Sequence, residues 1–197
     1  MYNISGIGEV RERIFFVAET FFFDEDIASF RGFRDSYTMN DELIYRWNSV
    51  VMRRDIVYHL GNFSSGDKSE TDEVLKQLNG RINLIVGESD NTGNILSLRN
   101  KLNSCNYKLE ITIDDYRLTM NHYPQYNWNE CGNQNSFMLH ASTAHNLQHQ
   151  PPLLQDKLIF DVGLDNPFLK YTPIEFAEIC ELMKMKYEYF KTEEYFL

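Results

Sequence analysis

The sequence has no apolar run long enough to cross a membrane. A membrane-spanning helix needs about 20 consecutive, predominantly apolar residues. The longest apolar stretches of this chain are interrupted by Glu19 and elsewhere by aspartate or arginine. Residues 1–13 also lack the basic region followed by an apolar segment that is typical of a secretory signal. We therefore expect no secretory signal and no association with a membrane.

Cysteine is scarce, and the familiar catalytic signatures are missing. The three cysteines, Cys105, Cys131 and Cys180, lie far apart and in none of the spacings of a metal-binding motif. This pattern favours reduced thiols and predicts a cytoplasmic protein. There is no P-loop, no G-x-S-x-G nucleophile elbow and no G-x-G-x-x-G motif after a strand.

Basic residues are outnumbered by acidic ones. The chain has 19 lysines and arginines against 29 aspartates and glutamates, a formal net charge of -10. Binding to a nucleic-acid backbone needs clustered basic residues, so we do not expect it. Two interpretations of the acidity remain open, namely plain solubility and mimicry of a nucleic acid that occupies a basic partner.

The residues that are present predict one folded domain. The chain has 197 residues, of which 43% are hydrophobic and 24% are charged, as is ordinary for a globular protein. We therefore predict a single domain over residues 1–197.

The first half alternates between strand and helix patterns. Short apolar segments and longer amphipathic segments follow one another at residues 13–18, 38–52, 55–61, 71–78 and 82–87. In the first helical segment, Thr38 and Asp41 resemble a capping box. Alternation of this kind predicts parallel strands, with functional groups at their C-terminal ends.

The second half has a different pattern. Residues 108–124 contain two alternating runs around Asp114 and Asp115, which predict an antiparallel hairpin, and strands are expected at residues 137–143 and 157–164. Thr172 is expected to open a final helix, with Pro173 at its first position. We predict that residues 184–197 either extend this helix or dock on the body. The fold class is therefore mixed α/β.

Six segments carry a resemblance to a known family. They are RWNSVV (46–51), DIVYHLGNF (55–63), LKQLNGR (75–81), NHYP (121–124), LHAS (139–142) and DVGLD (161–165), in the family's order over residues 13–180. The chain resembles the small calcineurin-like metallophosphoesterases of bacteria and phages. The resemblance implies a sandwich of two mixed β-sheets flanked by helices. It also implies a two-metal centre where strand ends converge, in which the ions polarise a phosphate and generate a hydroxide nucleophile.

The first two ligand motifs of that family are altered here. The family's Asp-x-His corresponds to Glu19 and Phe21, and a conserved glycine of the same motif corresponds to Phe23. The bridging aspartate corresponds to Asn62, which is neutral. The resemblance therefore implies that an aromatic ring and an amide stand where two metal ligands are expected.

The later motifs are altered as well. The family's Asn-His pair corresponds to Glu88 and Ser89, and the two closing histidines correspond to Ser142 and Ala144. Only the lone histidine, His122, is unchanged. We therefore predict that these vestigial positions do not assemble the family's two-ion site, and no catalytic residue is predicted.

Our first functional hypothesis is a pseudoenzyme with no cofactor. It would act by binding a protein partner with a basic surface, as an inhibitor or decoy. The alternative is a divergent phosphoesterase with one Mn, Fe or Zn ion held by Glu19, Glu88, His122 and His145, since mixed oxygen and nitrogen ligands suit these metals. Asp90 and the acids at residues 24–26 lie on the same loops. Phosphate-ester binding without turnover is the third hypothesis.

Other polar residues are expected to be structural. We interpret His59 as a hydrogen-bonded core histidine. Asp161 and Asp165 lie on either side of a predicted turn and are expected to fix loops.

Overall fold

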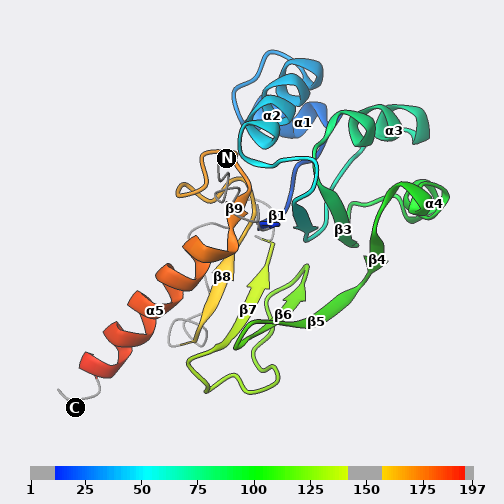
Figure 1. Ribbon diagram of the computed structural model, residues 1–197. Helices are drawn as coiled ribbons and strands as arrows, with labels where there is room; N and C mark the ends of the chain where they lie inside the picture. The colour runs from blue at the N-terminus through cyan, green and yellow to red at the C-terminus, as the bar shows by residue number, and fades with distance from the viewer. Residues whose placement is uncertain (1–11, 142–156, 194–197) are drawn as a thin grey trace, which may run out of the picture.

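The computed structural model describes residues 12–141 and 157–193 and contains two mixed β-sheets flanked by helices (Figure 1). The strands are β1 (Ile14–Val17), β2 (Ile56–His59), β3 (Arg81–Ile85), β4 (Ser104–Asn106), β5 (Lys108–Ile113), β6 (Tyr116–Asn121), β7 (Ser136–His140), β8 (Ile159–Asp161) and β9 (Ile174–Glu175). The helices are α1 (Glu25–Phe30), α2 (Ser36–Val50), α3 (Lys68–Gln77), α4 (Thr92–Ser97) and α5 (Phe176–Glu193), with a 3-10 helix, η1, at Arg99–Lys101. The predicted mixed α/β class is confirmed. No helix in the described ranges is long and apolar enough to span a membrane.

The five-stranded sheet has the order β4-β3-β2-β1-β9. Strands β1 to β3 are parallel, as the alternating pattern predicted; β4, which was not predicted, is parallel to β3, and β9 is antiparallel to β1. The four-stranded sheet has the order β5-β6-β7-β8. Its first pair is the predicted antiparallel hairpin, and the other two pairs are parallel. Because strands β1, β2 and β3 run in the same direction, the loops that follow them lie at one edge of their sheet.

The three helices that cover the first sheet, α1, α2 and α3, each have an aspartate as their N-cap. Asp24 accepts a hydrogen bond from Ile27 N in α1, and Asp35 accepts one from Thr38 N in α2. Asp67 caps α3 and forms a full capping box with Glu70. An aspartate side chain in this position satisfies a helix N–H that would otherwise lack an acceptor.

Three predicted helix starts are wrong. The helix expected from Thr71 begins at Lys68, because Asp67 and Glu70 form its capping box. The helix expected from Thr38 begins two residues earlier, because Asp35 and not Thr38 is its N-cap. The helix expected from Thr172 begins only at Phe176. Residues 174 and 175 instead form β9, in which Ile174 pairs with Phe16 and is buried. Pairing at the sheet edge therefore overrides the local capping signal.

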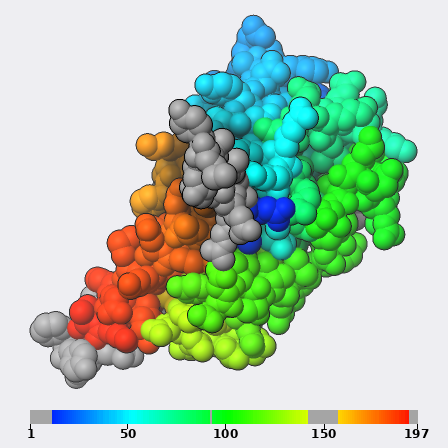
Figure 2. Space-filling view, in the orientation of Figure 1, coloured from blue at the N-terminus to red at the C-terminus, as the bar shows by residue number. Residues whose placement is uncertain are grey.

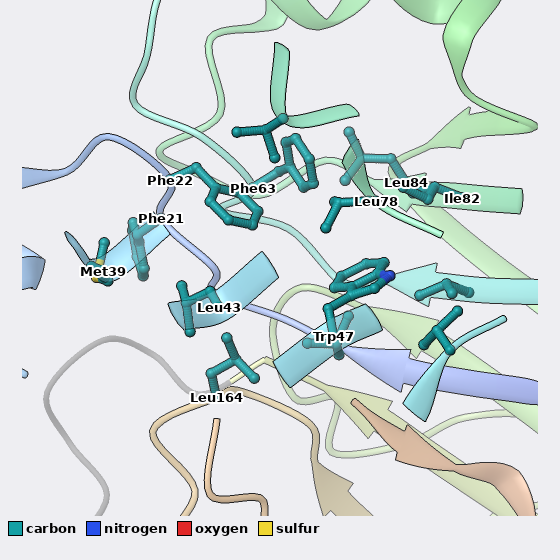
Figure 3. Packing of buried hydrophobic residues seen from close by; sticks show 14 of the residues in the cluster. Phe21, Phe22, Met39, Leu43, Trp47, Phe63, Leu78, Ile82, Leu84 and Leu164 are labelled. Carbon is teal, nitrogen blue, oxygen red and sulfur yellow. The ribbon is translucent and has the colours of Figure 1, made fainter. Parts of the chain in front are cut away.

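Two large hydrophobic clusters lie on opposite faces of the first sheet. The first cluster joins β1, β2 and β3 to α1, α2 and α3, and its labelled side chains are shown in Figure 3, with Trp47 of α2 near Leu78. The second cluster contains side chains of both sheets and of α5, including Phe16, Leu118 and Ile179. The two sheets therefore share one buried interface.

Helix α5 carries the C-terminal residues away from the body. In Figure 1 its C-terminal half extends beyond the two sheets, and in Figure 2 the same residues, coloured red, project from the lower left of the molecule. Tyr187 and Phe190 pack against the second cluster, whereas Tyr189 is exposed. Of the two predictions for the tail, extension of the helix is confirmed as far as Glu193, and residues 194–197 lie outside the described part.

Candidate functional site

The loops that follow β1, β2, β3 and β6 meet at one place. Glu19 N donates a hydrogen bond to Gly61 O over 2.9 Å, and Phe21 N donates one to Asn62 O over 2.9 Å. His122, at the end of β6, lies so close to Gly61 that a Cβ on this glycine would be 2.6 Å from His122 Nδ1. The structure therefore brings together the predicted positions Glu19, Phe21, Asn62 and His122.

The backbone is strained at this junction. Glu19, Phe21, Phe23 and Asn62 have φ values of 60, 48, 64 and 56 degrees, in the left-handed region that favours glycine. For a residue other than glycine this conformation costs about 1–2 kcal/mol. Such residues persist only where the surrounding contacts fix them, and they concentrate at functional sites.

Arg31 makes several of the contacts that fix the segment with positive φ values. Its buried guanidinium donates to the carbonyl oxygens of Glu19 over 2.7 Å and Thr20 over 3.2 Å. The same group forms a two-pronged ion pair with Asp165, at 2.9 and 2.7 Å. Arg31 therefore holds the carbonyl groups of the strained segment and links the segment to Asp165. The sequence analysis did not single out Arg31. The prediction that Asp165 fixes a loop is confirmed by this contact.

The ring of Phe21 belongs to the hydrophobic core. It is buried in the first cluster, and Figure 3 shows it beside Met39 of α2. The Arg31 guanidinium lies 5.9 Å from the ring centroid, within the range of a cation–π contact. Phe23 makes an edge-to-face contact with Tyr37 at 5.7 Å. The aromatic residues of this segment thus join it to α1 and α2.

Asn62 and Ser89 contact each other directly. Ser89 N donates to Asn62 Oδ1 over 2.9 Å. The amide oxygen therefore has a protein donor, and the loops after β2 and β3 are tied together.

The Asp90 side chain also connects the loops after β2 and β3 through hydrogen bonds. Its carboxylate accepts hydrogen bonds from the backbone N–H groups of Asn62, Phe63 and Gly87, at 2.9, 2.7 and 2.7 Å. Burial raises the pKa of Asp90, and the three N–H groups oppose that rise. Since these contacts occupy both carboxylate oxygens, Asp90 is a structural clamp.

Glu88 lies on the surface next to the clamp. Its carboxylate accepts a hydrogen bond from the Tyr123 hydroxyl, and this contact raises the pKa of Tyr123. Tyr123 also packs edge-on against His122, with ring centroids 4.8 Å apart. Glu88 is exposed, whereas Glu19 is buried. The two glutamates therefore have different surroundings.

His122 is held in one tautomer. Its Nδ1 lies 2.8 Å from Leu60 O. A carbonyl oxygen can only accept, so Nδ1 carries a proton, and in the neutral ring the lone pair is on Nε2. Histidines that bind metals are often oriented in this way, with the second ring nitrogen donating to a backbone carbonyl.

His59 is a hydrogen-bonded core histidine, as predicted. Gly61 N donates to its Nδ1 over 3.2 Å, so Nε2 carries the proton and donates to Thr20 Oγ1 over 3.0 Å. The Thr20 hydroxyl in turn donates to Phe63 O over 2.7 Å. Burial, assisted by the nearby charge of His122, lowers the pKa of His59 to about 3. His59 is therefore neutral at physiological pH.

Asp24 and Glu25, two of the three acids after the aromatic run, make local structural contacts. Asp24 caps α1 and also accepts from the Ser65 hydroxyl over 2.7 Å. Glu25 accepts from Ser36 N and from its hydroxyl. Asp161, at the end of β8, accepts from Gly163 N over 2.7 Å, which confirms its predicted role in fixing a loop.

The closing motif is described only in part. Ser142, Ala144 and His145 lie outside the described residues. His140, at the end of β7, is buried, and its Nδ1 donates to Ala141 O over 2.6 Å. Burial lowers the pKa of His140 to about 4. Within residues 12–141 and 157–193, no three His, Cys, Asp or Glu side chains come together in a way that would hold a metal ion.

Comparisons with known proteins agree with this fold. No family model matches the chain. The uncharacterized protein MJ1445 of Methanocaldococcus jannaschii is 25% identical over 176 residues, which covers 87% of this chain and 92% of that protein. The crystal structure of AQ665, a protein of unknown function from Aquifex aeolicus, matches with a TM-score of 0.68 and 20% identity, over 87% of this chain and all of that one. At this level of identity the similarity establishes a shared fold and nothing about activity.

A phosphoesterase is also among the structural matches. Yfce, a phosphoesterase from E. coli, matches with a TM-score of 0.42 and 14% identity, over 77% of this chain and 78% of its own. A TM-score this low gives no basis for assigning a function.

Proposed function

We propose that this chain is a metallophosphoesterase-like scaffold that acts by binding a protein partner and does not hydrolyse phosphate esters. The observation that carries the proposal is the use of the expected ligand positions in internal contacts. Asn62 Oδ1 accepts from Ser89 N, and the ring of Phe21 packs in the core. The loops still meet as the family resemblance implies, but the side chains at the expected ligand positions make hydrogen bonds and packing contacts within the protein.

The residues do not fit the family's two-ion centre. A bridging ligand between two cations has to be anionic, and Asn62 is a neutral amide. The ring of Phe21 offers no donor, and a dication beside an apolar ring lacks compensating charge. No step of a reaction is therefore derived through a metal pair.

The partner that we propose is a protein with a basic surface. The net charge of -10 favours association with such a surface over association with another acidic one. An inhibitor or decoy in the cytoplasm would fit this charge.

A hydrolysis assay tests the enzymatic half of the proposal. The full chain is incubated with Mn²⁺ and bis(p-nitrophenyl) phosphate, beside a His122→Ala variant. We expect both proteins to release p-nitrophenol at the rate of the protein-free blank. Mn-dependent release that His122→Ala abolishes would contradict the proposal.

Affinity capture tests the binding half. The immobilised chain should retain a protein that rebinds when it is purified separately. If no captured protein rebinds in purified form, the partner-binding proposal is wrong.

A single-ion phosphoesterase is the second candidate, and one observation favours it. Because His122 Nδ1 donates to Leu60 O, the Nε2 lone pair of His122 is available to a Lewis acid. The proposed ligands are Glu19, Glu88, His122 and His145, with Mn, Fe or Zn. This candidate requires His145, which lies outside the described residues, and it predicts metal affinity that His122→Ala removes.

A further inference from the structure

A groove of about 620 Å³ lies between the end of α2 and the first half of α5. Phe15 of β1 and Ile174 of β9 form its floor. Its volume is within the range of roughly 300–1,000 Å³ that is usual for binding pockets. It lies apart from the junction of loops around Asn62, whose residues do not line it.

Three large apolar side chains at the groove are exposed to solvent. Met52 follows α2, Phe168 precedes β9, and Met185 lies on α5, with exposed fractions of 55%, 82% and 62%. Side chains of this size are rarely exposed together without a binding role. Methionine is unbranched and flexible, so two of the three can adapt to the shape of a bound side chain.

Acidic residues border the apolar ones on α5. Glu178, Glu181, Leu182 and Met185 are spaced at i, i+3, i+4 and i+7, so they share one face of the helix, and all four line the groove. Glu178 and Glu181 are exposed, and no ion pair joins either of them to another residue of the described ranges. Among the residues that the structure describes, the negative charge at the lip of the groove therefore has no basic ion-pair partner.

The arginine in the groove is already paired. Arg13 lies 2.9 Å from Asp55 and 3.7 Å from Glu175, and it also donates to Val50 O at the end of α2. Its charge is thus balanced by neighbours on the same protein. A ligand that combines an apolar face with positive charge would match the groove better than a neutral or acidic one.

The sheet edge beside the groove is poorly suited to an added strand. Strand β9 has only two residues, and Pro173 before it lacks a backbone N–H. A second copy of this chain would bring a like-charged acidic lip. A helix that places apolar side chains in the groove and basic ones against Glu178 and Glu181 avoids both problems.

We propose that this groove binds an amphipathic, basic helix of a partner protein. The inference rests on the partner-binding part of the function proposed above and names the surface that would bind the partner. It does not depend on the absence of hydrolysis, because an active hydrolase could also recruit a partner here. Failure of the groove experiment would therefore leave the hydrolysis result unaffected, and the reverse also holds.

The probe is a fluorescein-labelled helical peptide of leucine and lysine, about 14 residues or roughly four turns long. Its matched control replaces every lysine with glutamate. Anisotropy titration with the full chain should show saturable binding of the lysine peptide and none of the glutamate peptide. The Glu178→Lys/Glu181→Lys variant should weaken the affinity at least roughly tenfold, and Met185→Glu should do the same.

A charge-matched control separates the groove from general attraction. Glu188→Lys/Asp26→Lys makes the same charge change at two exposed residues that do not line the groove, and it should alter the affinity less than roughly threefold. Equal weakening by both double variants would overturn the proposal. So would a dimer in sedimentation equilibrium that Met185→Glu dissociates, or binding seen only after residues 1–11 are removed, because either result would assign the groove to a different occupant.

Discussion

Arg31 stabilises a segment in which Glu19, Phe21 and Phe23 all have positive φ. Its buried guanidinium binds two carbonyl oxygens and the Asp165 carboxylate. Removing one member of a buried ion pair leaves an uncompensated charge and typically costs about 3–5 kcal/mol. We expect Arg31→Ala to lower the free energy of unfolding by about this amount in urea titrations.

Arg54→Ala is the matched control for this prediction. Arg54 is exposed, and its replacement should change the free energy of unfolding by less than about 0.5 kcal/mol. If Arg31→Ala were no more destabilising than Arg54→Ala, the role given to Arg31 would be wrong.

Two buried threonines offer a sharper comparison. Thr20 connects His59 Nε2 to Phe63 O, whereas Thr119 Oγ1 has no hydrogen-bond partner among the described residues. Thr20→Val leaves the buried N–H at His59 Nε2 without its acceptor and removes one of the two hydrogen bonds to Phe63 O, which still accepts from Phe22 N. The loss should lower the free energy of unfolding by about 1–3 kcal/mol. Thr119→Val removes an unsatisfied hydroxyl and should be neutral or stabilising. Equal effects of the two substitutions in urea titrations would contradict the hydrogen-bond assignment.

At the scale of elements, the loops after β2 and β3 lie so close together that there is no room for a side chain at Gly87. A Cβ on Gly87 would lie 2.5 Å from both the backbone N and the Oδ1 of Asn62. Overpacking of this kind typically costs about 1–3 kcal/mol, so we expect Gly87→Ala to lower the thermal unfolding midpoint clearly. Gly132→Ala is the control, because a Cβ there meets nothing within 4 Å. If both variants unfolded at the same temperature, the close approach of the two loops would be wrong.

The sequence predicted the main elements of the first half because hydrophobic periodicity is a local signal. Strands β1, β2 and β3 and helices α2 and α3 lie where apolar patterns placed them. The patterns did not predict the short elements α1, α4 and β4, which contain too few residues for a period to be visible. The start of α5 was missed because Ile174 pairs with Phe16 across the sheet, a long-range contact that local capping residues do not report.

For the molecule as a whole, two buried histidines predict a loss of stability in acid. The folded-state pKa of His59 is lowered to about 3 and that of His140 to about 4, from an ordinary value of 6.5. Below pH 6.5 the unfolded chain takes up protons that the folded chain does not. Stability should therefore fall as pH falls, by up to about 1.4 kcal/mol per pH unit for each histidine, between pH 6.5 and about 4.

Urea unfolding at pH 7.0, 6.0 and 5.0 measures this slope above the range in which most carboxylates titrate. A His140→Gln variant should show a shallower slope between pH 6.5 and 5.0. A free energy of unfolding that stays constant over this interval would show that the two histidines are not held neutral in the fold.

The candidate site could be predicted in part. The resemblance placed Glu19, Asn62, Glu88, Ser89 and His122 on loops that the structure does bring together. The contacts that hold these loops could not be predicted, because Arg31, Thr20 and Asp90 act through distant backbone groups. The resemblance places Phe21 where that family has a histidine, but only the fold shows that its ring packs in the core beside Met39.

We propose that this junction of loops is structural and does not bind metal. Calorimetric titration of chelator-treated protein with Mn²⁺ tests it most directly, with His122→Ala as the comparison. We expect no saturable heat up to millimolar Mn²⁺ for either protein. Tight binding by the native chain that is lost in His122→Ala would contradict it and would favour the single-ion phosphoesterase.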